Sequence, residues 1–338
     1  MPRALAAAIL AIAMPALGAV SSAAPAPGED TAAYQHLIDA ANAVVAVKVR
    51  AIPGARSTRR LGAERTGSGV VIAPSGLVLT IGYLILEADQ VEIVTARGRT
   101  AVATVAAYDH ATGFGLLRPI GQLDVKPVRL GSSDKVSELD RLMFAAAGGG
   151  DAVSVATVVS KRQFAGYWEY LIDGAIFTTP PRIDHSGAAL IDKDGELVGI
   201  GSLVVMNAAA EDERLPGNMF VPIDLLKPIL DEMVATGRQK GGMRPWLGMS
   251  SLEDDGQIRV FGVSEGGPAE AAGIVEGDVI LAMAGRKVEH LADFYRRLWS
   301  SGAPGVEVTL KVRHGATVRD VRVRSIDRLD FVRKRPTI

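Results

Sequence analysis

The chain has 338 residues, of which 48% are hydrophobic, and its formal net charge is −1. This length suffices for two modest packed domains, and the nearly balanced charge argues against a nucleic-acid partner. The sequence contains no cysteine, which excludes thiolate catalysis, disulfide bonds and cysteine-containing zinc sites. Its five histidines form no metal-binding motif, so we expect neither a metal ion nor another cofactor.

Residues 1–24 have the pattern of a signal peptide. Arg3 supplies the positive charge, residues 4–17 form an apolar run, and small residues offer a cleavage site near Ala24. An uncleaved membrane anchor is the alternative, but Pro15 and the shortness of the apolar run disfavour a stable spanning helix. We therefore expect a cleaved, periplasmic or secreted protein with no membrane span.

Residues 31–236 have the pattern of a mainly β domain. After one helical segment, short apolar stretches alternate with turn residues, which predicts an antiparallel barrel or sandwich. Residues 51–67 are polar, basic and glycine-containing, so we expect a loop there. Residues 188–204 predict a β-hairpin with Asp194 and Gly195 in its turn.

Residues 218–237 predict a strand followed by an amphipathic helix. The apolar stripe of this helix would consist of Leu225, Leu226, Ile229, Leu230 and Met233. The segment at 237–245 is rich in glycine and charge, which favours a domain boundary there.

Residues 243–326 have the pattern of a smaller α+β domain. Strands alternate with two helical segments, at 269–273 and at 291–299. The last strand alternates cleanly, so we expect Val321 and Val323 on its buried face and the charged residues between them on the other face.

Five segments occur in the order found in HtrA/Deg-type trypsin-like serine proteases: TGSGVVIAPSGLVLT, YDHATGFGLL, LGSSDK, IDKDGELVGI and NMFVPID. A sixth segment, EGGPAEAAGIVEGDVILAMAGRKV, resembles the core of the PDZ domain that follows the protease domain in that family. The resemblance implies that residues 31–236 form a trypsin-like double six-stranded β-barrel domain and that residues 243–326 form a PDZ domain. It also implies an exported protein that assembles as a homotrimer.

The same resemblance locates the catalytic triad, and two of its three positions are degenerate. The nucleophile position holds Ser186, but the general-base position holds Tyr83 and the position of the orienting aspartate holds Gly113. A serine hydroxyl needs an imidazole to take its proton and a carboxylate to orient that imidazole. The reference pKa of tyrosine is about 10, so Tyr83 would rarely accept the proton at neutral pH. We expect Ser186 to be idle.

The oxyanion hole is altered as well. In the family it uses the amides of the serine and of a glycine two residues earlier, but here Asp184 takes the place of that glycine. A carboxylate beside the developing negative charge would be repulsive. His185 and His110 are the imidazoles that a rewired triad could use. Adjacent residues on an extended turn point in different directions, and we interpret both as surface histidines.

The PDZ resemblance implies a peptide-binding groove that needs no catalytic group. PDZ domains add a peptide strand to a sheet edge and hold its terminal carboxylate with backbone amides. The residues expected to form this groove are Trp246, Leu247, Gly248, Met249, Phe294 and Leu298. The first four would form the carboxylate-binding loop and the last two the opposite wall, although ordinary core positions are the alternative for the last two.

Three functions fit these patterns. The leading hypothesis is an exported, catalytically inactive HtrA-like protein that binds peptides or protein C-termini and acts in envelope protein quality control. The second is a serine endopeptidase with weak or rewired activity at Ser186. The third is an assembly subunit whose barrel packs against an active relative.

Overall fold

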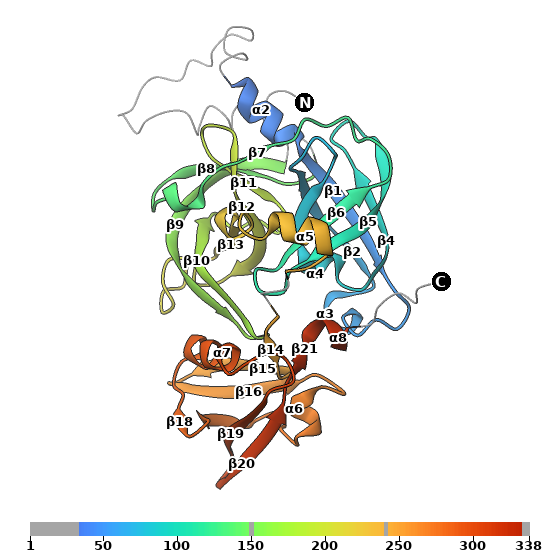
Figure 1. Ribbon diagram of the computed structural model, residues 1–338. Coiled ribbons are helices and arrows are strands. Elements are labelled where there is room, and N and C mark those ends of the chain that lie inside the picture. The colour runs from blue at the N-terminus through green and yellow to red at the C-terminus, as the bar shows by residue number, and fades with distance from the viewer. Residues whose placement is uncertain (1–33, 149–151, 240–242, 333–338) are drawn as a thin grey trace. The chain divides into compact units, whose positions relative to one another are not determined.

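The computed structural model describes residues 34–148, 152–239 and 243–332, so the predicted signal peptide lies outside the described residues. The chain divides into two compact units (Figure 1). Of the described residues, unit 1 contains those up to Tyr108, those in Gly113–Arg162 and those in Gly174–Arg238. Unit 2 contains Asp109–Thr112, Gln163–Asp173 and the described residues from Gln239 onward.

Unit 1 begins with helix α2 (Gln35–Asn42), which leads into a closed six-stranded antiparallel barrel. The strands are β1 (Val44–Ala51), β2 (Glu64–Val71), β3 (Val78–Ile81), β4 (Ala88–Val94), β5 (Thr100–Tyr108) and β6 (Phe114–Pro119). Around the barrel they follow the order β1, β2, β3, β6, β5, β4. Alternate valines of β1 are buried, whereas Lys48 and Arg50 between them are exposed, as expected for a strand with one apolar face.

The segment predicted as a loop at residues 51–67 is partly regular. Helix α3 (Thr58–Leu61) and the first residues of β2 lie within it, so the loop prediction is wrong for these parts. The physical reason is Arg65, whose buried guanidinium donates hydrogen bonds to three backbone carbonyl groups. A basic residue that is typical of a solvated loop is thereby part of the packed structure.

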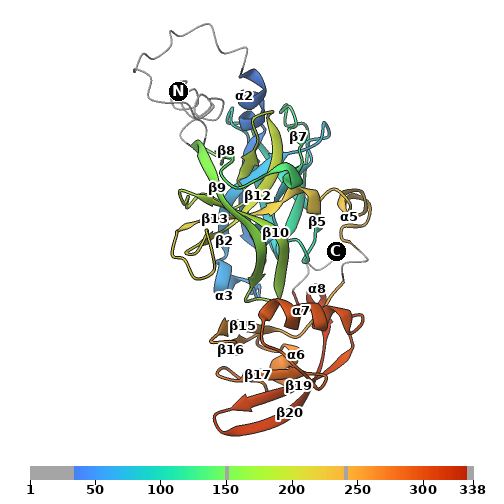
Figure 2. The same ribbon diagram turned by 90° about the vertical axis from the view of Figure 1, so that its left-hand side faces the viewer.

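A second barrel follows along the chain (Figure 1). Its strands are β8 (Arg141–Ala145), β9 (Val153–Gly166), β10 (Tyr170–Thr179), β11 (Ala189–Ile191), β12 (Glu196–Val205) and β13 (Gly217–Pro222), with the short β7 (Arg129–Leu130) paired to β12. The order is β11, β8, β9, β10, β13, β12, and pairing of β11 with β12 closes the ring. Figure 2 shows β9 and β10 as long neighbouring strands.

The expected double six-stranded β-barrel is therefore confirmed. The predicted hairpin is confirmed as β11 and β12, with Gly195 at a φ of 74° in its turn. Inside the second barrel, Phe144 and Phe220 meet edge to face with ring centroids 6.1 Å apart.

The helix predicted after β13 begins later than expected. Leu225 lies in a short 3₁₀ turn, η3 (Ile223–Leu225), and the α-helix α5 spans only Leu230–Thr236. Pro228 explains the delay, because it has no amide proton to continue a helix and restricts the residue before it. The fully buried members of the predicted stripe are Leu226, Ile229 and Met233.

Unit 2 contains a six-stranded sheet with two flanking helices. Its elements are β15 (Met249–Asp254), β16 (Gln257–Val263), β17 (Val279–Met283), β18 (Arg286–Lys287), β19 (Glu307–His314), β20 (Thr317–Arg324), α6 (Pro268–Ala271) and α7 (Leu291–Ser300). β15 lies at one end of the strand order. Val321 and Val323 of β20 are buried and Arg322 is exposed, which confirms the predicted alternation.

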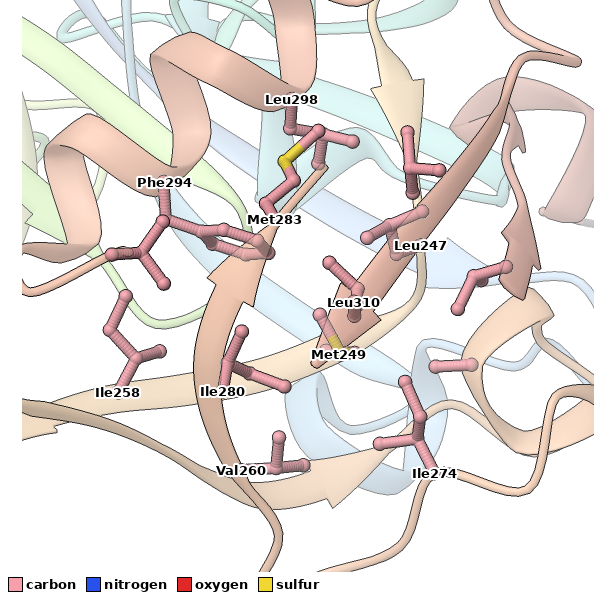
Figure 3. Close-up of a cluster of buried hydrophobic side chains, with 14 of the residues drawn as sticks. Leu247, Met249, Ile258, Val260, Ile274, Ile280, Met283, Phe294, Leu298 and Leu310 are labelled. Carbon is pink, nitrogen blue, oxygen red and sulfur yellow. The ribbon is translucent and has the colours of Figure 1, made fainter. Parts of the chain in front are cut away.

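Short elements at the two ends of unit 2 pair with each other. β14 (Pro245–Trp246) is antiparallel to β21 (Ile326–Asp327), and the helix α8 (Arg328–Phe331) follows directly. The core of the unit gathers apolar side chains from the sheet and from α7 (Figure 3). Its fully buried members include Leu247, Val260, Ile280, Phe294, Leu298 and Leu310.

Candidate functional site

The register of the first barrel brings together Tyr83 and Gly113, the two positions at which the sequence predicts a degenerate triad. β3 ends at Ile81, which pairs with Phe114, the first residue of β6. The turn α4 (Gly82–Ile85), which carries Tyr83, therefore follows β3 next to Gly113. The amide of Gly82 donates to the carbonyl oxygen of Gly113 at 2.6 Å.

Ser186 lies in a tight turn just before β11, and β2 holds its backbone. The Ser68 amide donates to the carbonyl oxygen of Ser186 at 2.8 Å. Gly187 has a φ of 74°, and a Cβ atom there would lie 2.0 Å from the Ser68 carbonyl oxygen. Only glycine fits this close approach, so the serine-glycine turn that presents a nucleophile is intact.

The hydroxyl of Tyr83 contacts Ser186, the expected nucleophile position. Its oxygen lies 2.8 Å from Ser186 Oγ and 2.8 Å from the carbonyl oxygen of Ser202. A carbonyl oxygen can only accept and a phenol has one proton, so Tyr83 donates to Ser202 and leaves the Ser186 hydroxyl to donate to the phenol oxygen. Burial raises the pKa of Tyr83 to about 12, and its hydrogen bond with Ser186 offsets only part of that effect. The contact engages the Ser186 hydroxyl without deprotonating it.

Arg65 fixes the turn that carries Tyr83. Its Nη1 atom donates to the carbonyl oxygens of Tyr83 at 3.0 Å and Leu86 at 2.6 Å, and its Nη2 atom donates to Ser57 Oγ at 2.7 Å. Burial lowers the pKa of Arg65, and the charge of Glu87 acts in the opposite direction. A buried cation thus satisfies the carbonyl groups at the end of α4, which have no partner within such a short helix.

Asp184, at the altered oxyanion position, is paired with Arg182. Nε and Nη2 of Arg182 donate to the two carboxylate oxygens at 2.9 and 2.6 Å. Burial alone would raise the pKa of Asp184, but the hydrogen bonds and charge of Arg182 lower it below its ordinary value. Pairing with Arg182 weakens the expected repulsion between Asp184 and a developing negative charge.

The two histidines considered for a rewired triad have other surroundings. Nδ1 of His185 lies 3.2 Å from the carbonyl oxygen of Arg182, and burial lowers the pKa of this half-buried imidazole. His110 belongs to unit 2 and both of its ring nitrogens are buried, so the surface interpretation is wrong for it. Burial, followed by the charges of Arg328 and Arg244, holds the pKa of His110 well below its usual value. His110 is therefore neutral in the folded protein.

The predicted carboxylate-binding loop holds a carboxylate from the same chain. The amides of Leu247, Gly248 and Met249 donate to the carboxylate of Glu169 at 2.9, 2.7 and 3.0 Å. Gly248 has a φ of 81°, which glycine adopts without strain. Glu169 lies between β9 and β10, and both it and the loop belong to unit 2. The loop geometry suits a carboxylate group.

The remaining predicted groove residues lie inside unit 2. Trp246 is buried and packs against α8. Phe294 and Leu298 are fully buried, and Figure 3 shows them on α7 in the same cluster as Leu247 and Met249. Phe294 and Leu298 therefore lie in the hydrophobic core, as the alternative interpretation of these two residues expected.

Sequence reasoning missed three residues that shape these sites, namely Arg65, Glu169 and Tyr295. The Tyr295 hydroxyl accepts a hydrogen bond from the Glu169 amide at 3.2 Å. Glu169 lies in the run Tyr-Trp-Glu-Tyr, where a lone charge among aromatic residues needs a partner to be buried. That signal could have singled out Glu169, whereas nothing local to Arg65 or Tyr295 predicts its partners.

Two searches of the described ranges bear on other kinds of site. Within those ranges, no group of three or more histidine, aspartate or glutamate side chains could hold a metal ion. The same part of the chain has no helix with the length and apolar character needed to cross a membrane.

Comparison with known proteins matches both domains. The family model described as a trypsin-like peptidase domain matches residues 67–200, and the PDZ domain model matches residues 245–324. A probable periplasmic serine endoprotease DegP-like of Pseudomonas fulva is 27% identical over 276 residues, covering 76% of this chain and 55% of that protein. Serine protease PepD of Mycobacterium tuberculosis is 26% identical over 267 residues, covering 72% of this chain and 57% of PepD. The chain thus spans little more than half the length of these relatives.

Solved structures share the fold. The serine endoprotease from Yersinia pestis superposes with a TM-score of 0.51 at 21% identity, covering 90% of this chain and 99% of that one. The HtrA-type protease AlgW with decapeptide gives a TM-score of 0.52 at 19% identity, covering 89% and 98%. At this identity the likeness concerns the fold alone. The two domain models show a trypsin-like peptidase domain followed by a C-terminal PDZ domain, so the chain is a trypsin-like serine protease homologue with a PDZ domain, similar to the HtrA-type proteases among its relatives.

Proposed function

We propose that this protein is an exported HtrA-type homologue that has lost proteolytic activity and binds peptide segments or protein C-termini through its PDZ domain. Its role would lie in envelope protein quality control, as a binding or regulatory factor. Export is supported by the signal-peptide pattern and by relatives named as periplasmic. A homotrimer is the assembly that the family resemblance implies.

The observation that carries the loss of activity is the hydrogen bond between Tyr83 and Ser186. With the pKa of Tyr83 raised to about 12, about one phenol in 10⁵ would be ionised at pH 7. Removal of the histidine base from a serine protease costs on the order of 10⁶ in turnover, or about 8 kcal/mol of barrier. Tyr83 replaces that base with a neutral group that also occupies the space an imidazole would need.

The PDZ part of the proposal is supported by the amides of the loop at Leu247, Gly248 and Met249. They converge on one carboxylate group, which is the recognition that a peptide C-terminus requires. β15 is the edge strand of the sheet beside this loop, which is the element to which a PDZ domain adds a peptide strand.

A weak serine endopeptidase is the second candidate, and one feature favours it. The turn at Ser186 and Gly187 is intact, and Arg182 neutralises the acid at the oxyanion position. A residual activity from binding and positioning alone would be consistent with such a site.

A fluorophosphonate probe with a casein cleavage assay separates the two candidates. For an idle nucleophile we expect no stoichiometric labelling of the purified protein and casein turnover no higher than that of Ser186→Ala. Labelling that is complete in the native protein and lost in Ser186→Ala would refute inactivity and support the second candidate. Molar mass measured by light scattering tests the homotrimer independently.

A further inference from the structure

The carboxylate of Glu169 is bound as a peptide carboxylate would be. Three consecutive amides, from Leu247 to Met249, donate to its two oxygens at distances between 2.7 and 3.2 Å. The side chain is buried. This loop is the one that the PDZ resemblance assigns to carboxylate recognition, so its donors are already engaged by the chain itself.

A backbone hydrogen bond also joins the turn that carries Glu169 to the edge strand β15. The amide of Ser251 donates to the carbonyl oxygen of Tyr167 at 2.9 Å. Tyr167 lies two residues before Glu169, and Ser251 lies two residues after Met249, so the two segments run antiparallel. Since β15 is the edge strand of its sheet, the tip of the β9–β10 hairpin occupies the edge to which a peptide strand would be added.

The helix α7 holds the hairpin tip from another side. The hydroxyl of Tyr295 donates to the carbonyl oxygen of Gly166 at 2.9 Å and accepts from the amide of Glu169 at 3.2 Å. The ring of Tyr167 meets Phe261 of β16 edge to face at 5.2 Å. The tip is thus bound by the loop, by the sheet and by a helix of the same unit.

We propose that Tyr167, Trp168 and Glu169 form an internal ligand of the PDZ groove, and that a peptide C-terminus binds by displacing Glu169 from the loop, a step that rests on the peptide-binding function proposed above. The competing ligand is a peptide with a free carboxylate, because only that group can replace all the hydrogen bonds of Glu169 with the three amides. A peptide with an amidated C-terminus lacks the charge that these donors select.

Two features make the internal ligand displaceable. Glu169 has a φ of 58°, a left-handed conformation that a non-glycine residue adopts only at a cost. Burial also opposes its charge and raises the pKa of Glu169 to about 7, although the amides of Leu247 and Met249 and the charge of Arg328 act the other way. A peptide C-terminus can bind the loop without requiring a left-handed backbone conformation at any of its residues.

The experiment combines peptide binding with a probe of the loop itself. Fluorescein-labelled decapeptides ending in valine, leucine or phenylalanine, with free and amidated C-termini, are titrated by fluorescence polarisation. The proteins compared are the native chain, Glu169→Gln, Glu169→Ala and the matched control Asp173→Asn, which changes an exposed acid of the same segment. The Gly248 amide resonance of each protein is recorded by ¹⁵N–¹H NMR, and urea unfolding checks that each variant is folded.

We expect the Gly248 resonance to shift in both Glu169 variants and to stay in place in Asp173→Asn. Peptides with a free carboxylate should bind the Glu169 variants at least tenfold more tightly than they bind the native protein. In these variants the internal ligand no longer occupies the groove, so a larger fraction of the protein is able to bind peptide. Amidated peptides should gain less than twofold.

The outcomes distinguish this proposal from the function on which it rests. An unmoved Gly248 resonance, or equal peptide affinity in the native protein and in folded Glu169 variants, overturns the internal ligand. If the Gly248 resonance shifts but no variant binds peptide, then peptides do not compete with Glu169 for the loop, and the proposed peptide-binding function is overturned as well. Peptide binding that is equally tight in all four proteins keeps that function and refutes the internal ligand alone.

Discussion

The charge of Glu169 gives the stability of unit 2 a pH dependence of defined sign. Burial raises the pKa of Glu169 to about 7 in the folded protein, against an ordinary value of 4.5. Between these two pH values the folded state keeps a proton that the unfolded chain has lost. The contribution of Glu169 to the free energy of unfolding is therefore fully present below pH 4.5, is lost as the pH rises through about 7, and levels off above that value.

The size of the effect follows from the interval between the two values, 4.5 and about 7, which is about 2.5 pH units. This interval corresponds to on the order of 3 kcal/mol of unfolding free energy. The charged and titratable groups facing Glu169 keep their state over the window. Arg328 stays a cation, and burial raises the pKa of Tyr295 further above its already high ordinary value. Glu169→Gln should remove this pH dependence.

Tryptophan fluorescence provides a selective assay, because the three tryptophans of the chain, Trp168, Trp246 and Trp299, all belong to unit 2. Urea unfolding of the native protein and Glu169→Gln is compared at pH 4.5, 6 and 8. Between pH 4.5 and pH 8, we expect the native protein to lose on the order of 3 kcal/mol of unfolding free energy relative to Glu169→Gln. Parallel pH profiles would refute a raised pKa. If the native protein instead became more stable relative to Glu169→Gln as the pH rises, the amide hydrogen bonds would outweigh the effect of burial on the pKa of Glu169.

Three further changes test the site in unit 1. Tyr83→His should raise fluorophosphonate labelling at least tenfold, since an imidazole regains a place beside Ser186, and unchanged labelling would show that the missing base is not the main defect. Gly187→Ala should lower the unfolding free energy by at least about 2 kcal/mol by circular dichroism, because its Cβ would strike Ser68 at positive φ, and a stable variant would contradict that geometry. Arg65→Lys should cost about 1–3 kcal/mol in the same assay, since lysine cannot reach the same carbonyl groups together, and a neutral result would mean that other contacts hold the Tyr83 turn.

Much of the fold could be predicted from the sequence because its strands carry clear local patterns. The alternating valines of β1 and β20 and the turn at Asp194 and Gly195 each specify a strand or hairpin on their own. The failures arose where tertiary contacts override local pattern. The segment around Arg65 is polar and basic, but burial of its guanidinium against backbone carbonyls makes it regular.

The candidate sites were predictable to different degrees. Tyr83 and Ser186 could be paired because the family resemblance assigns both to catalytic positions, and the hydrogen bond between them agrees with that assignment. The hydrogen bond from Tyr83 to the carbonyl oxygen of Ser202 depends on the path of β12, which no local sequence pattern reveals. Glu169 and the loop at Gly248 are separated by almost 80 residues, and no pattern in either segment specifies the other.

The two altered sites share a physical logic. Backbone groups still form both of them: the Ser186 turn is held by the Ser68 amide, and the loop at Gly248 presents its amides to one carboxylate. In each site a side chain of the same protein contacts the backbone-held group: the Tyr83 hydroxyl contacts Ser186, and the Glu169 carboxylate accepts from the loop amides. A backbone scaffold depends mainly on glycine positions and strand register, so it tolerates replacement of the side chains that supply chemistry. Under the two proposals above, the sites differ in reversibility, because Tyr83 would stand permanently in the place of the base, whereas an external carboxylate would displace Glu169 from the loop amides.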